Sequence, residues 1–213
     1  VSLETQNGTV ITQATTDSTG SYSIQTSAGN YYFEVNGDNN DFSLNIPQHY
    51  DLNTTLAGSA YSLTQDTILD FTIPTKRVIV HVQDSSSNPL SNVGVKSVVE
   101  NNVWANTGGL SFLSTITGVS GTDTYGINYE APTTDASGNA ILWLIPTNGT
   151  SYDFTATPPN GSIYSLSTLN NITVTGDQTE LISLQYSHNP STTTATLSPT
   201  PDNQGEYSDP TTV

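Results

Sequence analysis

The chain has no cysteine and almost no positive charge. Of its 213 residues, 3 are Lys or Arg and 19 are Asp or Glu, which gives a formal net charge of −16 at pH 7. Without cysteine there is no disulfide, no thiolate nucleophile and no zinc–thiolate site. The acidic excess opposes binding to nucleic acid or to anionic lipid, because both carry negative charge. Any charged partner is therefore expected to be a cation.

Long apolar runs and ordinary surface charge are also missing. No run approaches the roughly 18 apolar residues that a membrane-spanning helix requires, so membrane insertion is not expected. Charged residues make up only 10% of the chain, whereas Ser and Thr supply 61 residues and Asn another 20. Hydroxyl and amide groups must therefore make most of the surface's contacts with water. The surface of an ordinary cytosolic protein relies on charged side chains instead.

An internal repeat relates the first third of the chain to the last third. The turn Thr15–Gly20 matches Thr133–Gly138, with an Asp placed to bond nearby backbone and a Gly free to adopt positive φ. Each turn leads into segments whose apolar residues recur at every second position, which predicts strands of matching parity. The matched sets are Tyr22 and Ile24 with Ala140, Leu142 and Leu144; Tyr31, Phe33 and Val35 with Tyr152, Phe154 and Ala156; Tyr61 and Leu63 with Ile172 and Val174; and Leu69, Phe71 and Ile73 with Ile182, Leu184 and Tyr186.

The whole pattern predicts an all-β fold. Apolar residues nowhere follow a helical period for three turns, and short strands are interrupted by Gly, Pro, Asn or Ser about every 8–12 residues. The length suits two domains of about 100 residues each. We therefore expect two tandem Ig-like (Greek-key) β-sandwich modules, at residues 1–75 and 76–187, and an extended Ser/Thr/Pro-rich tail at 188–213. The second module carries an aromatic insert at 101–132.

These motifs resemble bacterial and archaeal surface Ig-like modules of the carboxypeptidase regulatory-like type. In the second module the resemblance is carried by Val78–Val95, Thr133–Gly138 and Tyr152–Ala156, and in the first by Thr15–Gly20 and Tyr31–Val35. It implies a scaffold in an extracellular or cell-surface setting. Because the motifs are short and describe a fold, the resemblance implies no reaction.

The first module lacks a counterpart of Arg77–Val93, which includes the first strand of the second module. An Ig-like sheet without that strand exposes unpaired backbone groups beside an apolar groove. Two explanations remain open. The strand can lie upstream in a longer precursor, or a neighbouring copy can supply it by donor-strand complementation, which would link copies into a filament.

The tail contains the candidate donor strand. Its composition is also typical of a disordered or O-glycosylated stalk. The six residues with high β propensity are Thr192, Thr193, Thr194, Ala195, Thr196 and Leu197.

Five sequons are candidates for N-linked glycans. Their number is what chance gives for this composition, so the prediction depends on an extracellular location and on their placement at turns or strand edges. The five acceptors are Asn7, Asn53, Asn148, Asn160 and Asn171.

Two further segments contain candidate ligand-binding residues. Asn36–Asp41 gathers oxygen ligands of the kind Ca²⁺ prefers, but it lacks EF-hand spacing and is interpreted as a hairpin turn. Within the insert, Trp104, Phe112, Tyr125 and Tyr129 could stack on sugars. The favoured interpretation is that the insert covers the outer face of the strand Ala140–Ile145, which is apolar on both sides.

No catalytic set is apparent, and no cofactor is expected. His49, His81 and His188 are scattered, so their spacing predicts no metal triad and no nucleophile–histidine pair. The sequence therefore predicts a structural protein and not an enzyme: a subunit of an extracellular filament, pilus-like thread or surface stalk whose partners are copies of itself. The alternative is a carbohydrate-binding or adhesive module of a larger secreted protein, with glycans as partners.

Overall fold

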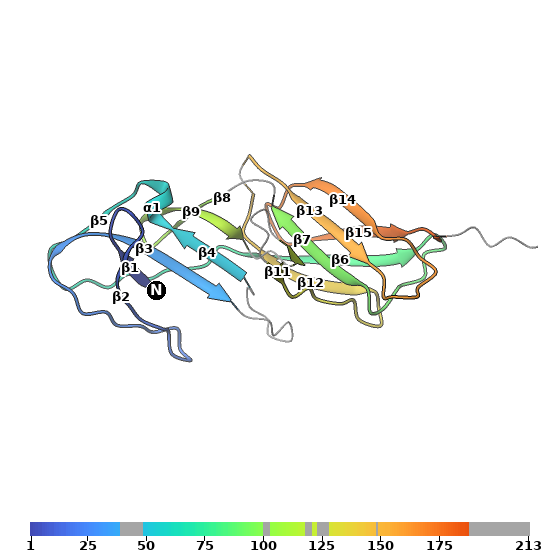
Figure 1. Ribbon diagram of the computed structural model, residues 1–213, viewed down its shortest axis with the longest axis horizontal. Helices are drawn as coiled ribbons and strands as arrows, with labels where there is room; N and C mark the ends of the chain where they lie inside the picture. Colours follow the sequence, from blue (N-terminus) through green and yellow to red (C-terminus); the bar gives the residue numbers. More distant parts are fainter. Residues whose placement is uncertain (39–48, 100–102, 118–120, 123–127, 148, 188–213) are drawn as a thin grey trace, which may run out of the picture.

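The computed structural model describes residues 1–38, 49–99, 103–117, 121–122, 128–147 and 149–187. Figure 1 shows an elongated molecule whose two halves lie end to end. Apart from one four-residue helix, all regular elements in the described part of the chain are strands, which confirms the all-β prediction. The finer assignment, two Ig-like Greek-key modules followed by a tail, stays a prediction.

The strands divide between the two halves. The first half contains β1 (Ser2–Glu4), β2 (Val10–Gln13), β3 (Gly29–Asp38), β4 (His49–Asn53), helix α1 (Thr54–Ala57), β5 (Tyr61–Leu63), β8 (Val103–Thr107) and β9 (Leu110–Thr117). The second half contains β6 (Lys76–Asp84), β7 (Gly94–Val99), β12 (Asn139–Leu144), β13 (Tyr152–Thr157), β14 (Ser167–Ile172) and β15 (Gln178–Leu184), with the short pair β10 (Gly121–Thr122) and β11 (Asn128–Tyr129) beside it.

One seven-stranded sheet forms the first half. Its strands lie in the order β2-β1-β3-β4-β9-β8, and β5 pairs with the start of β3. Along β3, Tyr31, Phe33 and Val35 are buried while the residues between them are half-buried, as the two-residue period predicted. The apolar face of this sheet forms the core of the first half.

The pairing of β8 and β9 corrects the expected place of the insert. We expected residues 101–132 to belong to the second module and to cover the outer face of the strand Ala140–Ile145. Instead β9 pairs with β4, β8 pairs with β9, and Ile141 on β12 stays 39% exposed. The chain therefore leaves the second half after β7, adds two strands to the sheet of the first half, and returns.

The second half contains two three-stranded sheets, β12-β6-β15 and β14-β13-β7. Strand β6 is central in the first of these, antiparallel to β12 and parallel to β15. Its inward residues Val78, Val80 and Val82 are 0% exposed. Because both of its edges are paired and its apolar side chains are fully enclosed, β6 is a central core element of this half.

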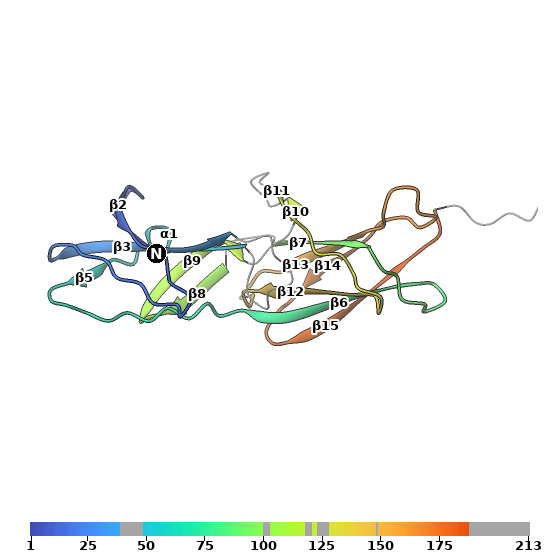
Figure 2. The same cartoon turned by 90° about the horizontal axis from the view of Figure 1, so that it is seen from below.

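Two strands expected in the first half do not form. The segments around Tyr22–Ile24 and Leu69–Ile73 are extended but carry no strand assignment. Figure 2 shows the second segment running along the first half as a trace without an arrow until it enters β6. A strand requires a hydrogen-bonded neighbour, and no described part of the chain supplies one to either segment.

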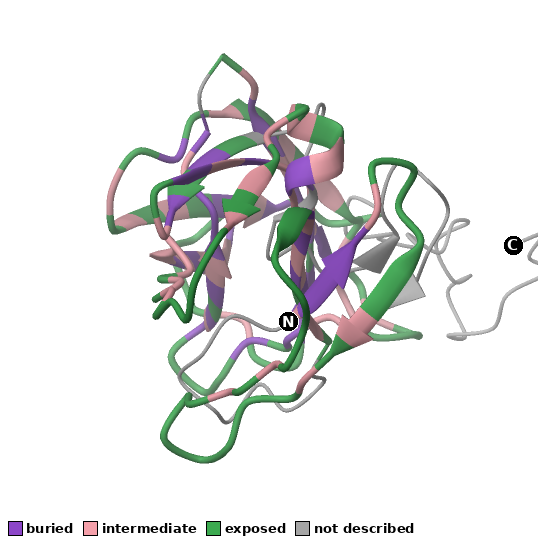
Figure 3. Cartoon of the chain, turned by 90° about the vertical axis from the view of Figure 1, so that its left-hand side faces the viewer, coloured by how far each residue is buried: buried purple, intermediate pink, exposed green. Residues whose placement is uncertain are grey.

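The burial pattern agrees with this arrangement. In the end view of the first half, buried residues lie within the paired strands, whereas the connecting segments are mostly exposed or half-buried (Figure 3). Among the described residues, no helix is long and apolar enough to cross a membrane.

Candidate functional site: an open groove in the first half

A groove of about 440 Å³ opens in the first half. One wall is the segment 19–24 with Thr26, and the other is the segment 67–70. Its floor comes from β1, β3 and β5, and the residues that line it are Leu3, Tyr31, Phe33, Tyr61 and Leu63. The groove thus has an apolar floor and two extended walls.

The second half fills the equivalent position with β6. The repeat matches the wall at 21–26 with β12 and the wall at 65–71 with β15. In the second half β6 lies between those two strands, with six paired positions along β12 and seven along β15. The groove therefore lies where a strand equivalent to β6 would be.

The backbone of the walls is left without ladder partners. Within the described part of the chain, no backbone–backbone hydrogen bond involves residues 22–28 or 64–71. Paired strands elsewhere satisfy these N–H and C=O groups, and unpaired edges readily accept an incoming strand. Both walls are therefore available for strand addition.

The wall side chains are less buried than their counterparts. Tyr22, Ile24, Leu69 and Phe71 are all half-buried. Their counterparts in the second half are buried, with Ala140, Leu142, Ile182 and Leu184 between 0% and 3% exposed. In the second half, apolar side chains of β6 cover the equivalent face. No described strand of the first half takes that place, so the wall side chains stay partly exposed.

Two matched glycines, Gly20 and Gly138, differ in the same way, because only Gly138 lies against the backbone of β6. Gly138 has φ +77°, and a Cβ atom built on it would lie 2.5 Å from the carbonyl oxygen of Val82 on β6. Gly20 has φ +82°, and a Cβ atom there meets nothing within 4 Å. The turn is conformationally alike in both halves, but the backbone that crowds it in the second half is absent in the first.

A tyrosine bridges the open groove. The Tyr22 hydroxyl donates a hydrogen bond to the Leu69 carbonyl oxygen at 2.8 Å, and its ring stacks on Phe71 with centroids 6.2 Å apart. Burial raises the pKa of Tyr22, and the negative charge of Asp70 adds to the shift. The hydroxyl thus stays protonated and serves as a donor to one wall carbonyl.

The added strands support one wall. Phe71 packs edge-on against Phe112 of β9 at 5.7 Å and lies 5.5 Å from Phe33 of β3. The Thr72 backbone N–H donates to Thr107 Oγ1 at 2.6 Å. Gly108 allows this approach, because a Cβ atom there would lie 2.7 Å from the Phe71 ring. The insert therefore fixes the position of the groove wall at Phe71.

The four sequon asparagines that the structure describes have different surroundings. Asn7 and Asn160 are exposed at turns, and Asn171 is exposed at the end of β14 with φ +61°. Asn53 is half-buried at the N-cap of α1, where its Oδ1 accepts from the Thr55 N–H at 2.7 Å and its Nδ2 donates to Glu4 at 3.4 Å. A glycan replaces one hydrogen of Nδ2 and would compete with this bond to Glu4 at Asn53, whereas among the described residues Asn7 uses only its Oδ1 in hydrogen bonds.

The aromatic residues of the insert lie in different surroundings. Trp104 is 49% exposed on the edge strand β8, but Phe112 is fully buried in the core, so the two do not share an exposed sugar-binding surface. Tyr129 belongs to β11. Tyr125, Asn148 and the candidate donor residues 192–197 lie outside the described residues.

Among the described residues, no group of three or more His, Cys, Asp or Glu side chains could hold a metal ion. His49 Nδ1 lies 2.9 Å from Asp38, and His81 Nδ1 lies 2.9 Å from Asn139, in different halves. The first three residues of the proposed calcium loop, 36–38, are the end of strand β3 and not a turn, while 39–41 lie outside the described residues. His188 also lies outside them.

The sequence predicted both the inward wall residues and an apolar groove beside unpaired backbone, because the first module lacks a counterpart of Arg77–Val93. It did not predict that Tyr22 bridges the groove or that the insert supports the wall at Phe71. Strand periodicity gives no signal for either contact, since each joins segments far apart in the sequence.

No family model matches the chain, and no curated protein matches it. The chain is similar to a solved structure described as "Structure of the Streptococcal ancillary pilin", with 16% sequence identity and a TM-score of 0.34. The match covers 78% of this chain and 46% of that chain, so this chain spans less than half the length of the streptococcal structure. Similarity at this level assigns no function.

Proposed function

We propose that this protein is a structural subunit of an extracellular filament, pilus-like thread or surface stalk, in which copies join by β-strand pairing. The observation that carries the proposal is the open groove, with two unpaired walls at the position that β6 fills in the second half. An incoming strand would satisfy the wall backbone and place alternate side chains on the apolar floor. In the second half, β6 already fills the equivalent position, between β12 and β15.

The proposed donor is the tail of a neighbouring copy. Residues 192–197 have high β propensity, and 26 residues follow the last described residue, Ser187. Donor-strand complementation by this tail would link copies head to tail. A strand from upstream of Val1, in a longer chain, is the competing occupant.

The composition suits an exposed surface in such an assembly. Hydroxyl and amide side chains dominate, and the absence of cysteine means that strand pairing must hold the assembly without disulfides. We propose an extracellular or cell-surface location, with N-linked glycans at accessible sequons such as Asn7 and Asn160 and O-linked glycans on the tail. Enzymatic activity is not part of this proposal.

Electron microscopy and sedimentation of the full chain test this function. The full chain is expected to form filaments, and a variant lacking residues 188–213 is expected to stay monomeric. Leu69→Asp places a charge in the groove and should block assembly, whereas Leu56→Asp, at a residue 51% exposed on α1, should not. Circular dichroism checks that each variant folds. A full chain that stays monodisperse at every concentration contradicts the proposed function.

A second candidate function rests on Trp104. This side chain is 49% exposed on an edge strand, and exposed aromatic rings stack on sugars. An adhesive module would bind a glycan array, and Trp104→Ala would abolish that binding. Filaments whose assembly is indifferent to Trp104→Ala favour the structural function.

A further inference from the structure

We infer that the joint between neighbouring subunits repeats the joint between the two halves of one chain, so that residues 191–197 of one copy occupy the groove of the next in the register of β6. This inference rests on the proposed function and adds the direction and register of the partner segment. Five features support it: the entry of β6 into the second half, the alignment of the tail with β6, the side-chain sizes at the joint, the prolines that flank the tail segment, and the direction of the strands.

The joint within the chain is short and direct. The wall segment that ends at Ile73 passes through Pro74 and Thr75 into β6, which begins at Lys76. Strand β6 then runs antiparallel to β12 and parallel to β15. The closing segment of one half is thus followed at once by the strand that completes the next half.

The tail continues from the second half in the same way. The repeat matches Ile73 with Tyr186, and extending that match past Tyr186 aligns the tail with β6. Ser191, Thr193 and Ala195 then take the places of Val78, Val80 and Val82. Residues 192–197 match the last six residues of β6.

The side chains on the two sides of this joint compensate in size. In the second half Val80 pairs with Ala140, and in the proposed joint Thr193 pairs with Tyr22. Ser191 and Ala195 are smaller than their matches Val78 and Val82, and the wall residue Tyr22 is larger than its match Ala140. A groove with larger wall residues accepts a strand with smaller inward residues, as close packing requires.

Prolines bound the tail segment at both ends. Pro190 precedes Ser191, and Pro199 follows Ser198. Proline is tolerated at the first residue of a strand and interrupts the interior of one. The uninterrupted length between the two prolines fits one strand of the size of β6.

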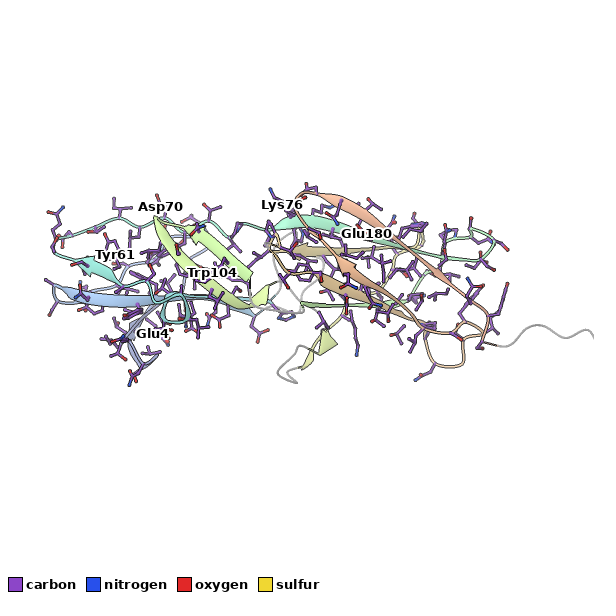
Figure 4. The ribbon with its side chains drawn as sticks, turned by 90° about the horizontal axis from the view of Figure 1, so that it is seen from above. Glu4, Tyr61, Asp70, Lys76, Trp104 and Glu180 are labelled. Carbon is purple, nitrogen blue, oxygen red and sulfur yellow. The ribbon has the colours of Figure 1, made fainter. Side chains whose placement is uncertain are left out.

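The direction of the strands suits a linear assembly. In Figure 1 the β6 arrow points away from the first half, and β15 is parallel to it, so the described chain ends near the far tip of the second half. The groove lies in the opposite half, whose junction with the second half is marked by Lys76 in Figure 4. A strand leaving one copy at that tip and entering the first half of the next gives a head-to-tail chain.

Engineered disulfides test the register, because the chain has no cysteine of its own. Ile79 pairs with Ile141 and with Thr179 in the second half, and the matched positions in the joint are Thr192 with Ser23 and Thr192 with Asp66. These pairs point away from the core, and cross-strand neighbours are within disulfide reach. Ser23→Cys combined with Thr192→Cys, and Asp66→Cys combined with Thr192→Cys, are each prepared in the full chain.

Under mild oxidation, each pair is expected to convert most of the chain into a ladder of covalent multimers on a denaturing gel. Ser23→Cys with Thr193→Cys, which points to the opposite face, is the matched control and should give no ladder. A ladder from the control but not from the Thr192 pairs overturns the register. Covalent monomers alone, with the bond inside one copy, overturn the intersubunit joint.

The two proposals can fail separately. Filaments seen by electron microscopy with no cross-link from either Thr192 pair or from the Thr193 control refute the tail as the donor, while the structural function stands. Absence of filaments from the cysteine-free chain refutes the structural function itself. Filaments that persist after deletion of residues 188–213 identify another strand, such as one upstream of Val1, as the occupant.

Discussion

Tyr22 reaches across an open groove to bond the backbone of Leu69, with 2.8 Å between its hydroxyl oxygen and the Leu69 carbonyl oxygen. The two residues belong to opposite walls, which in the second half would be held together by the central strand β6. The side chain thus connects two walls that have no backbone ladder between them. Removing this contact should therefore loosen the first half before any partner binds.

Tyr22→Phe keeps the ring that stacks on Phe71 and removes only the hydroxyl. We expect the free energy of unfolding to fall by about 1 kcal/mol, the usual net value of one hydrogen bond. Chemical denaturation of a variant lacking residues 188–213 measures the change in the absence of a tail. Tyr32→Phe is the control, since the half-buried Tyr32 makes no hydroxyl hydrogen bond among the described residues. Equal losses in both variants would contradict a specific role for the Tyr22 hydroxyl.

Phe112 should stabilise the first half even though it comes from the insert. Its side chain is 0% exposed and packs against Phe71. Phe112→Ala is expected to cost about 3–5 kcal/mol, the usual range for a buried phenylalanine. Hydrogen exchange should increase in β3 and β4. Trp104→Ala, on the exposed side of β8, should change stability by under about 1 kcal/mol. Increased exchange confined to β6 and β12 would contradict the assignment of Phe112 to the first half.

Much of the strand content could be predicted from local patterns. The inward sets Tyr31, Phe33 and Val35 and Val78, Val80 and Val82 are all buried, because a two-residue period places alternate side chains on one face. The pairing of β9 with β4 could not be predicted in this way, since periodicity identifies a strand but not its neighbour. Burial of Phe112 follows from that pairing and was missed with it.

The unformed strands show the same limit. The residues around Tyr22 and Leu69 have the period of a strand, but a strand exists only where a partner satisfies its backbone. The inward faces, the missing counterpart of β6 and the groove that it leaves could all be predicted from the repeat. The hydrogen bond from Tyr22 to Leu69 across the groove could not, because periodicity holds no information on contacts between distant segments.

Glu4 should make stability depend on pH. It is 3% exposed, and burial raises its pKa above the ordinary value of 4.5, with the charge of nearby Glu34 adding to the shift. The folded state therefore favours the protonated carboxyl, and its stability falls as the pH rises from about 4.5 through the raised pKa. Glu4→Gln removes the buried charge and keeps an oxygen that can accept from Asn53.

Thermal unfolding at several pH values measures this effect. Glu4→Gln should have a higher melting temperature than the unmodified chain at pH 7, and the difference should vanish below about pH 4. Asp66→Asn, at an exposed position, is the control and should show little difference at either pH. A Glu4→Gln variant that is less stable at pH 7 would show that the ionised carboxylate stabilises the fold.

A substitution at Gly20 should prevent assembly without preventing folding. A side chain at its match Gly138 would collide with the Val82 carbonyl of β6, whereas a side chain at Gly20 meets nothing within 4 Å in the free protein. In the proposed joint Ala195 of the neighbour takes the place of Val82, so a Gly20 side chain would collide with the incoming strand. Gly20→Asn should therefore permit folding, because Asn tolerates positive φ, and prevent assembly.

Gly8→Asn is the matched control for this prediction. Gly8 also has positive φ, +77°, and open space around its Cβ position, but it lies in the turn between β1 and β2, outside the groove. Both variants should lose similar, small amounts of thermal stability, because both place Asn in the left-handed region. Electron microscopy should then show filaments for Gly8→Asn and none for Gly20→Asn. Normal filaments from Gly20→Asn would mean that no strand backbone passes this turn in the assembly, and the register of the joint would have to be abandoned.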